Sequence, residues 1–180
     1  MLLFKVKAMK RVKSILVFTA LFYFSGCGYH LIGTGASNLP GHLKTISIPT
    51  FVNKTKEPEI ERELTTAVRQ TFIRDGRLKV VSSGASADTV LKGEIRDYYL
   101  KPISYDASDL VNEYRVLIDI EVTFEDLVKK KILLQQSLRA DEAYKVSATI
   151  TGRETLLRET RRKAAEEMAE RLRSLVFEGF

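Results

Sequence analysis

Cys27 is the only cysteine in the 180-residue chain, and the residues before it are ordered as a signal for lipid attachment. Five lysines and arginines, with no acidic residue among them, come before an apolar stretch over residues 14–24 and the small pair Ser25-Gly26. Positive charge holds such an N-terminus on the cytoplasmic side while the apolar stretch enters the membrane. We therefore expect residues 1–26 to be removed and the Cys27 thiol to carry acyl chains.

Two other interpretations of this segment stay open, an uncleaved membrane anchor and a buried structural cysteine. The apolar stretch is shorter than the roughly 20 residues that a membrane-spanning helix needs, which favours cleavage. A lone cysteine cannot form an internal disulfide, whereas a thioether to lipid needs a single thiol. Because two or more acyl chains attach a protein stably, the mature chain would be anchored to a bilayer at Cys27.

Lys129, Lys130 and Lys131 form a run of three consecutive positive charges after Cys27. Ammonium groups bind phosphate as point charges, so this cluster is a candidate site for a phosphorylated ligand. The structural alternative is a solvated hairpin turn, because lysine is common at turns and sheet edges, where it discourages further strand pairing. The sequence alone leaves both interpretations open.

Composition argues against several classes of function. The formal net charge is +6, but five of the 29 lysines and arginines lie before Cys27, which leaves 24 basic and 23 acidic residues after it. A nearly neutral domain gives no support to nucleic-acid binding. His30 and His42 have no second ligand at metal-binding spacing, and the sequence has no nucleophile, phosphate-loop or zinc motif. We expect no enzymatic activity, no cofactor and no metal.

After the signal, a glycine-rich and polar stretch leads into a single domain. We expect residues 27–42 to form a lipidated tether, because glycine resists fixing in one conformation, and residues 43–180 to form the domain. Residues 44–49 predict a strand by their period-two alternation, and residues 51–55 predict a loop. A helix is expected next, with Pro58 in its first turn and Asp75-Gly76 at its end. Its predicted apolar face consists of Ile60, Leu64, Ala67, Val68, Thr71 and Phe72.

The sequence of the second half of the domain predicts four strands and a helix. Strands are expected at residues 78–81, 88–100, 114–124 and 132–144, with a polar connection at residues 101–110. The third of these strands alternates most clearly and is expected to form a hairpin with the fourth, with the three lysines at its tip. Its apolar face consists of Tyr114, Val116, Ile118, Ile120, Val122 and Phe124.

Thr151-Gly152-Arg153-Glu154 has the form of a capping box and predicts the start of the second helix. The predicted buried face of this helix consists of Leu156, Leu157, Thr160, Ala164, Met168, Leu172, Leu175 and Val176. Strands with one apolar face must bury it, and two amphipathic helices can cover it. We therefore predict an α+β fold, a mostly antiparallel or mixed sheet with both helices packed on one face.

A series of short motifs, in this order, resembles one known family. The motifs are Cys27-Gly28-Tyr29-His30-Leu31, Leu39-Pro40, residues 46–55, 61–64, 76–81 and 87–93, Ser104-Tyr105-Asp106, Glu113-Tyr114-Arg115-Val116 and Glu142-Ala143-Tyr144. Together they resemble the LptE family of lipopolysaccharide-assembly lipoproteins of Gram-negative bacteria, over essentially the whole mature chain.

The resemblance implies a role at the outer membrane. Members of the family are lipoproteins on its periplasmic face, where they plug the large β-barrel that inserts lipopolysaccharide into the outer leaflet. They help to assemble that barrel, can bind lipopolysaccharide and are not enzymes. Gly28 follows the cysteine where lipoproteins of the inner membrane tend to have aspartate, so the resemblance also implies outer-membrane sorting. In this setting, the ligands expected for Lys129, Lys130 and Lys131 are the phosphates of lipid A.

A second class of function stays open, that of a stand-alone periplasmic lipoprotein. Such a protein would be similar to the lipoproteins that assemble curli pores or activate cell-wall synthases. Residues 48–55 fit both classes, whereas Cys27-Gly28-Tyr29 and residues 105–114 fit the LptE family better.

Six further side chains have both a functional and a structural interpretation. Phe51 and Asn53 are candidate partner contacts, although such residues more often shape a loop, with asparagine bonded to its own backbone. Tyrosine is enriched in interfaces, but packing within the fold is at least as common. The candidate barrel contacts of this kind are Tyr98, Tyr99, Tyr105 and Tyr114.

Overall fold

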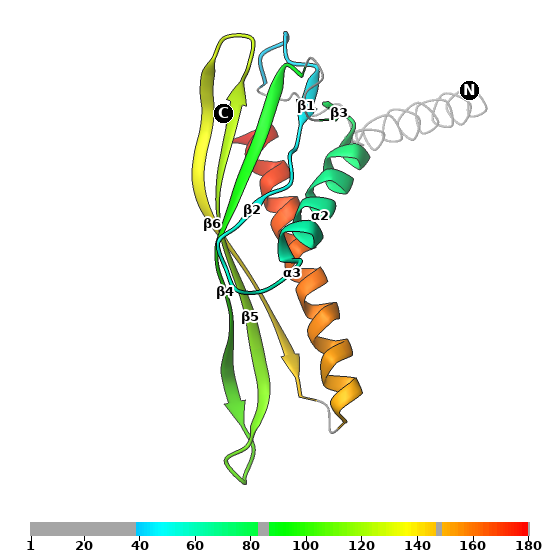
Figure 1. The fold of residues 1–180 in the computed structure, drawn as a ribbon, viewed down its shortest axis with the longest axis vertical. Coiled ribbons are helices and arrows are strands. Elements are labelled where there is room, and N and C mark those ends of the chain that lie inside the picture. The colour runs from blue at the N-terminus through cyan, green and yellow to red at the C-terminus, as the bar shows by residue number, and fades with distance from the viewer. Residues whose placement is uncertain (1–38, 83–86, 147–148, 180) are drawn as a thin grey trace, which may run out of the picture. The chain divides into compact units, whose positions relative to one another are not determined.

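A six-stranded mixed sheet lies against two helices that cover the same face of it (Figure 1). The computed structural model describes residues 39–82, 87–146 and 149–179. In chain order the elements are β1 (Thr45–Ser47), β2 (Val52–Asn53), α2 (Ile60–Asp75), β3 (Lys79–Val81), β4 (Thr89–Tyr105), β5 (Val111–Asp126), β6 (Lys131–Lys145) and α3 (Ile150–Glu178). The predicted α+β fold is confirmed.

The sheet joins a short parallel part to a long antiparallel part. Its strand order is β3-β1-β4-β5-β6, and β1 runs parallel to both β3 and β4. β2 also pairs with β4 in parallel, so β1 and β2 form two segments of one interrupted strand beside β4. β4, β5 and β6 are antiparallel neighbours and form most of the sheet.

The hydrophobic core lies between the sheet and the helices. β5 turns one face toward it, as its alternation predicts, and each of these side chains is at most 1% exposed: Val116, Ile118, Ile120, Val122 and Phe124. Leu117 lies on the opposite face, because successive side chains of a strand alternate, and it is buried as well. The tight packing of this face makes β5 the central strand of the core.

Both helices bury the faces that their periodicity predicts, with additions at the end of α3. α2 buries Ile60, Leu64, Val68, Thr71 and Phe72. On α3, Leu156, Leu157 and Leu175 are only half-buried, whereas Phe177 is fully buried with its ring centre 5.6 Å from that of Phe72. The last turn of α3 thus packs on the last turns of α2. No helix in the described part of the chain is long and apolar enough to cross a membrane.

The predicted polar connection over residues 101–110 is wrong for its first half. β4 continues to Tyr105, because Lys101 and Pro102 pair with Arg115 and Tyr114 of β5, and irregularities in the register accommodate the proline. Only residues 106–110 form the turn, which Asp106 closes by accepting hydrogen bonds from the amides of Ser108 and Leu110. Strand pairing therefore outweighs the polar composition of this stretch.

The two helix starts and the loop before α2 also differ from the prediction. α2 begins at Ile60, so Pro58 lies before the helix rather than in its first turn. The N-cap of α3 is Thr149, whose side chain accepts a hydrogen bond from the Gly152 amide at 3.1 Å, and Thr151 lies inside the helix. Within the predicted loop at residues 51–55, β2 pairs with β4. The end of α2 is as predicted, with Gly76 in the left-handed region at φ 74°.

Candidate functional site

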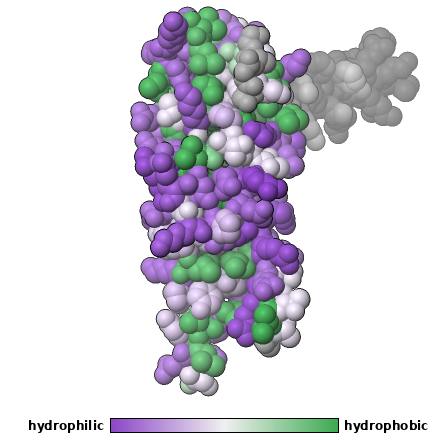
Figure 2. Space-filling view, viewed as in Figure 1, coloured by the Kyte–Doolittle hydropathy of each residue, from purple (hydrophilic) through white to green (hydrophobic). Residues whose placement is uncertain are grey.

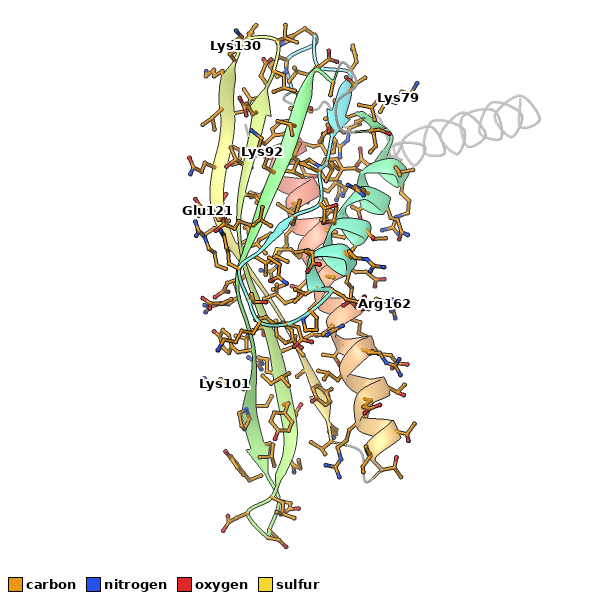
Figure 3. All side chains as sticks on the ribbon, in the orientation of Figure 1. Lys79, Lys92, Lys101, Glu121, Lys130 and Arg162 are labelled. Atoms are coloured by element: carbon orange, nitrogen blue, oxygen red, sulfur yellow. The ribbon has the colours of Figure 1, made fainter. Side chains whose placement is uncertain are left out.

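The three lysines lie at the turn between β5 and β6, as the sequence predicts (Figure 3). Lys129 and Lys130 are in the four-residue turn over residues 127–130, and Lys131 is the first residue of β6. All three side chains are exposed, and none forms an ion pair with another residue that the structure describes. Lys130 adopts a left-handed backbone with φ 52°, which lets the chain reverse direction here.

Asp126, the last residue of β5, fixes the geometry of this turn. Its side chain is 1% exposed; Oδ1 accepts a hydrogen bond from the Lys129 amide at 2.9 Å, and Oδ2 lies 2.8 Å from His42 Nε2. Burial would raise the pKa of Asp126, but the hydrogen bonds from Lys129 and His42 outweigh it and hold that pKa below its usual value. The carboxylate is thus occupied within the fold, while the three lysine side chains are exposed.

Asp88, just before β4, fixes the neighbouring backbone at the same end of the domain. Its Oδ2 accepts hydrogen bonds from the amides of Lys44 and Thr45 at 2.8 and 2.9 Å, and its carbonyl accepts one from the Leu127 amide at 2.8 Å. Lys44 and Lys79 also have exposed side chains without ion pairs to described residues, and Figure 3 shows Lys79 and Lys130 at the same end. We call this end, with Lys44, Lys79, Lys129, Lys130 and Lys131, the lysine end.

Apolar side chains are interspersed with these lysines, and sequence reasoning missed them. Val128 is 60% exposed, Ile132 54% and Leu127 40%. Figure 2 shows hydrophobic and hydrophilic surface side by side at this end of the domain. The signal was present in the sequence, because Leu127 and Val128 occupy positions between two predicted strands where polar turn residues are the rule.

The face of the sheet away from the helices is charged but internally paired. Lys92 contacts Glu125 at 3.0 Å, and Arg139 holds Asp119 at 2.6 Å through both of its carboxylate oxygens. Arg96 pairs with Glu94 and Glu121, and Arg115 with Asp141. The Asp119 carboxylate raises the pKa of Arg139. Unlike the lysine end, this face has few charges left for an anionic ligand.

The structural interpretation holds for Phe51 and Asn53. Phe51 is 2% exposed and packs so closely on β4 that a methyl group at Gly93 would lie 2.5 Å from its ring. Asn53 Oδ1 accepts hydrogen bonds from the Thr55 amide and hydroxyl, both at 2.8 Å, and its Nδ2 donates to the Glu57 carbonyl at 2.8 Å. These residues set the path of the chain into α2.

The four candidate tyrosines divide into two pairs. Burial, and then the charge of Glu57, raises the pKa of Tyr98 to about 12, and its ring packs against the core. Tyr114 stacks on Tyr144 with ring centres 5.9 Å apart. Tyr99 and Tyr105, at 40% and 57% exposure, remain accessible to a partner. Cys27 lies outside the described residues.

Solved structures with the same fold define the class to which this domain belongs. A hypothetical protein from Chlamydia trachomatis aligns with a TM-score of 0.54 at 12% identity, over 74% of this chain and 98% of that one. An uncharacterized lipoprotein B from Nitrosomonas europaea aligns with a TM-score of 0.51 at 14% identity, over 82% and 92%. At these identities the likeness shows the fold alone, a small α+β domain. No match was found among curated proteins.

The sequence of the domain identifies its family. The model of the LptE family, described as "Lipopolysaccharide-assembly", matches residues 43–172. The chain belongs to this family, as its motifs indicated. The family consists of lipoproteins that are not enzymes.

Proposed function

We propose that this protein is an outer-membrane lipoprotein on the periplasmic face that joins a large β-barrel and assists the insertion of lipopolysaccharide into the outer leaflet. The observation that carries the proposal is the family match, which covers residues 43–172 and so extends from the start of the domain core into α3. The lysine end adds a surface suited to a phosphorylated lipid. In this proposal the protein positions its partners and catalyses no reaction.

Attachment to the membrane is assigned to Cys27. It is the only thiol in the chain and follows Ser25-Gly26 after an apolar stretch. Mass spectrometry of protein purified from membranes is expected to show an acylated cysteine at a new N-terminus. A mature mass that includes residues 1–26 and no lipid would contradict this assignment. Cys27→Ala is expected to release the protein from the membrane while leaving the domain folded, because the domain core begins at Leu43.

The barrel contact is assigned to the outer face of the sheet and to the β4–β5 hairpin. Charges on that face neutralise each other, so it can lie against a hydrated, polar wall without leaving a charge unpaired. Tyr99, Tyr105 and Leu110 add exposed aromatic and apolar area. Such side chains are typical of the anchoring residues of interfaces.

Lys129, Lys130 and Lys131 are assigned to phosphate groups of lipopolysaccharide. Three exposed like charges repel each other, and an anionic head group would relieve that repulsion. Their backbone is fixed by Asp126, so the ammonium groups project from one small, ordered surface. Ordering of the turn on binding would therefore cost little.

Purification from detergent-solubilised outer membranes tests the proposal. We expect one very large β-barrel protein to co-purify with the chain in a fixed ratio. A cell-wall synthase or a ring of identical copies would instead support a stand-alone periplasmic lipoprotein. Tyr105→Ala together with Leu110→Ala is expected to weaken the barrel association, whereas Val52→Ala, at 50% exposure on β2, serves as a matched surface control.

A further inference from the structure

The lysine end combines positive charge with exposed apolar side chains in one turn. Val128 and Ile132 are more than half exposed, and Leu127 is 40% exposed, within a segment of six residues that also contains all three lysines. Single exposed apolar residues are ordinary on proteins, but a group of them beside a basic cluster marks an interaction surface. Ammonium groups above apolar side chains match the boundary between the phosphates and the acyl chains of a bilayer.

The backbone that carries these apolar side chains is held rigidly. The Leu127 amide donates to the Asp88 carbonyl at 2.8 Å, and the Lys129 amide donates to the buried Asp126 carboxylate at 2.9 Å. The β5–β6 ladder reaches the turn, with Asp126 opposite Lys131. The side chains are therefore presented as a fixed wedge, which would enter a bilayer without first having to order.

Charge distinguishes this end of the domain from the opposite one. Lys44 and Lys79 add positive charge at the same end, and the five lysines together outnumber the carboxylates of Asp88 and Asp126. The β4–β5 turn at the other end contains Asp106 and Asp109 and no lysine or arginine. A negatively charged membrane surface would therefore attract the lysine end and not the β4–β5 turn.

The chain itself enters the domain at the lysine end. His42, near the first described residue, lies 2.8 Å from Asp126 at the base of the turn. Leu39 is 12 positions after Cys27, so the chain between them can span at most roughly 40 Å. A lipid at Cys27 would therefore keep this end, with its apolar wedge, within reach of the bilayer.

We propose that the β5–β6 turn is a second membrane contact, which docks on the leaflet that holds the lipid anchor. The lysines contact phosphates of anionic phospholipids, while Leu127, Val128 and Ile132 enter the outermost part of the acyl layer. Together with the anchor, this contact fixes how the domain is oriented on the membrane. The inference rests on the proposed lipid at Cys27, but it does not require lipopolysaccharide binding.

The absence of tryptophan from the chain allows a direct test. Val128→Trp places a single tryptophan on the wedge, and Leu110→Trp places one on the opposite turn, where Leu110 is 65% exposed. Each variant is purified from membranes and reconstituted into phosphatidylcholine vesicles with or without phosphatidylglycerol, with bromine atoms on the acyl chains as quenchers. We expect a blue-shifted, several-fold more strongly quenched emission for Val128→Trp in the anionic vesicles, and solvent-like emission for Leu110→Trp.

Two further measurements distinguish binding to anionic lipid from binding to free phosphate. Serine at positions 129, 130 and 131, added to Val128→Trp, is expected to abolish the dependence on phosphatidylglycerol, and inorganic phosphate alone is expected to leave the emission unchanged. A phosphate-induced shift would show that the lysines bind free anions, which would overturn docking. Equal, solvent-like emission at both positions would also overturn it, even if lipopolysaccharide binding and barrel association are intact. Unaltered melting temperatures confirm that the variants are folded.

Discussion

At the scale of single residues, two aspartates order the backbone of the lysine end. Asp88 holds the amides of Lys44 and Thr45, and Asp126 holds the amide of Lys129. Each carboxylate is thus occupied by backbone donors in the fold. The five exposed lysines outnumber these two carboxylates, so the end is basic.

Asp88 is expected to make stability depend on pH in the acid range. Its pKa is lowered, first by the hydrogen bond from the Lys44 amide and then by that from the Thr45 hydroxyl. A carboxyl with a lowered folded-state pKa stabilises the fold above its unfolded pKa, near 3.8, and this contribution is lost as pH falls through the folded-state pKa. Asp88→Asn should therefore melt lower than the parent at neutral pH.

The comparison that checks this is thermal unfolding of both proteins between about pH 3 and pH 7. The difference in melting temperature between parent and Asp88→Asn is expected to shrink as pH falls below the unfolded-state pKa of 3.8 and toward the lower folded-state pKa, because the carboxyl then becomes protonated in both states. Parallel curves with a constant difference would mean that Asp88 acts through its shape and not through its charge.

At the scale of elements, β5 is the strand on which the core depends. Ile118 is 1% exposed on its apolar face, and truncation of such a residue to alanine costs about 2–5 kcal/mol. Glu121 lies on the outer face and contacts Arg96 and Gln135, and such exposed contacts contribute little to stability. Ile118→Ala should lower the melting temperature clearly and Glu121→Ala only slightly, as measured by circular dichroism. Equal effects of the two substitutions would contradict the assignment of Ile118 to the core face of β5 and of Glu121 to its outer face.

The start of α3 offers a second test at this scale. Thr149 is the N-cap that bonds the Gly152 amide, whereas the exposed Thr151 lies within the first turn. Loss of an N-cap hydroxyl costs about 0.5–2 kcal/mol, so Thr149→Ala should destabilise the domain in urea unfolding. Thr151→Ala is the matched control and should be close to neutral. The reverse order would place the cap where the sequence first indicated it.

The sequence pattern correctly predicted the elements in which buried and exposed residues keep one periodicity along the whole length. β5 alternates between core and solvent, and α2 repeats its apolar positions until Gly76, so both were correct. The far half of β4 was missed because Lys101 and Pro102 are both exposed, so no burial pattern marks them, and only their pairing with β5 keeps them in the strand. The two-residue β2 carries no periodicity that could reveal it.

The candidate site was predicted only in part for a related reason. The lysine run is local in sequence, so its place at a hairpin tip followed from the two flanking strands. The contact between His42 and Asp126 joins residues 84 positions apart, and no local pattern signals it. The same holds for Lys44 and Lys79, which the parallel pairing of β1 with β3 brings to the lysine end.

At the scale of the whole domain, the two proposed interactions, with the barrel and with lipopolysaccharide, belong to different surfaces. The outer face of the sheet pairs its own charges and suits a protein partner, whereas the lysine end leaves positive charge unpaired beside apolar side chains. In the proposed function, the ligand of the lysine end is lipopolysaccharide. Ligand binding and barrel association should therefore be separable by mutation.

The triple change Lys129→Ser, Lys130→Ser and Lys131→Ser separates them most directly. A matched control changes Lys56, Lys101 and Lys163 to serine, which removes the same charge from other exposed positions. Binding of each membrane-purified protein to immobilised lipopolysaccharide is measured at low and high salt. We predict that the triple variant binds more weakly than parent and control at low salt, with the difference shrinking as salt screens the phosphate contacts. Its melting temperature and barrel co-purification should be unchanged. Binding as tight as the parent's at low salt would show that the turn is only solvated, and loss of the barrel instead would make it a protein contact.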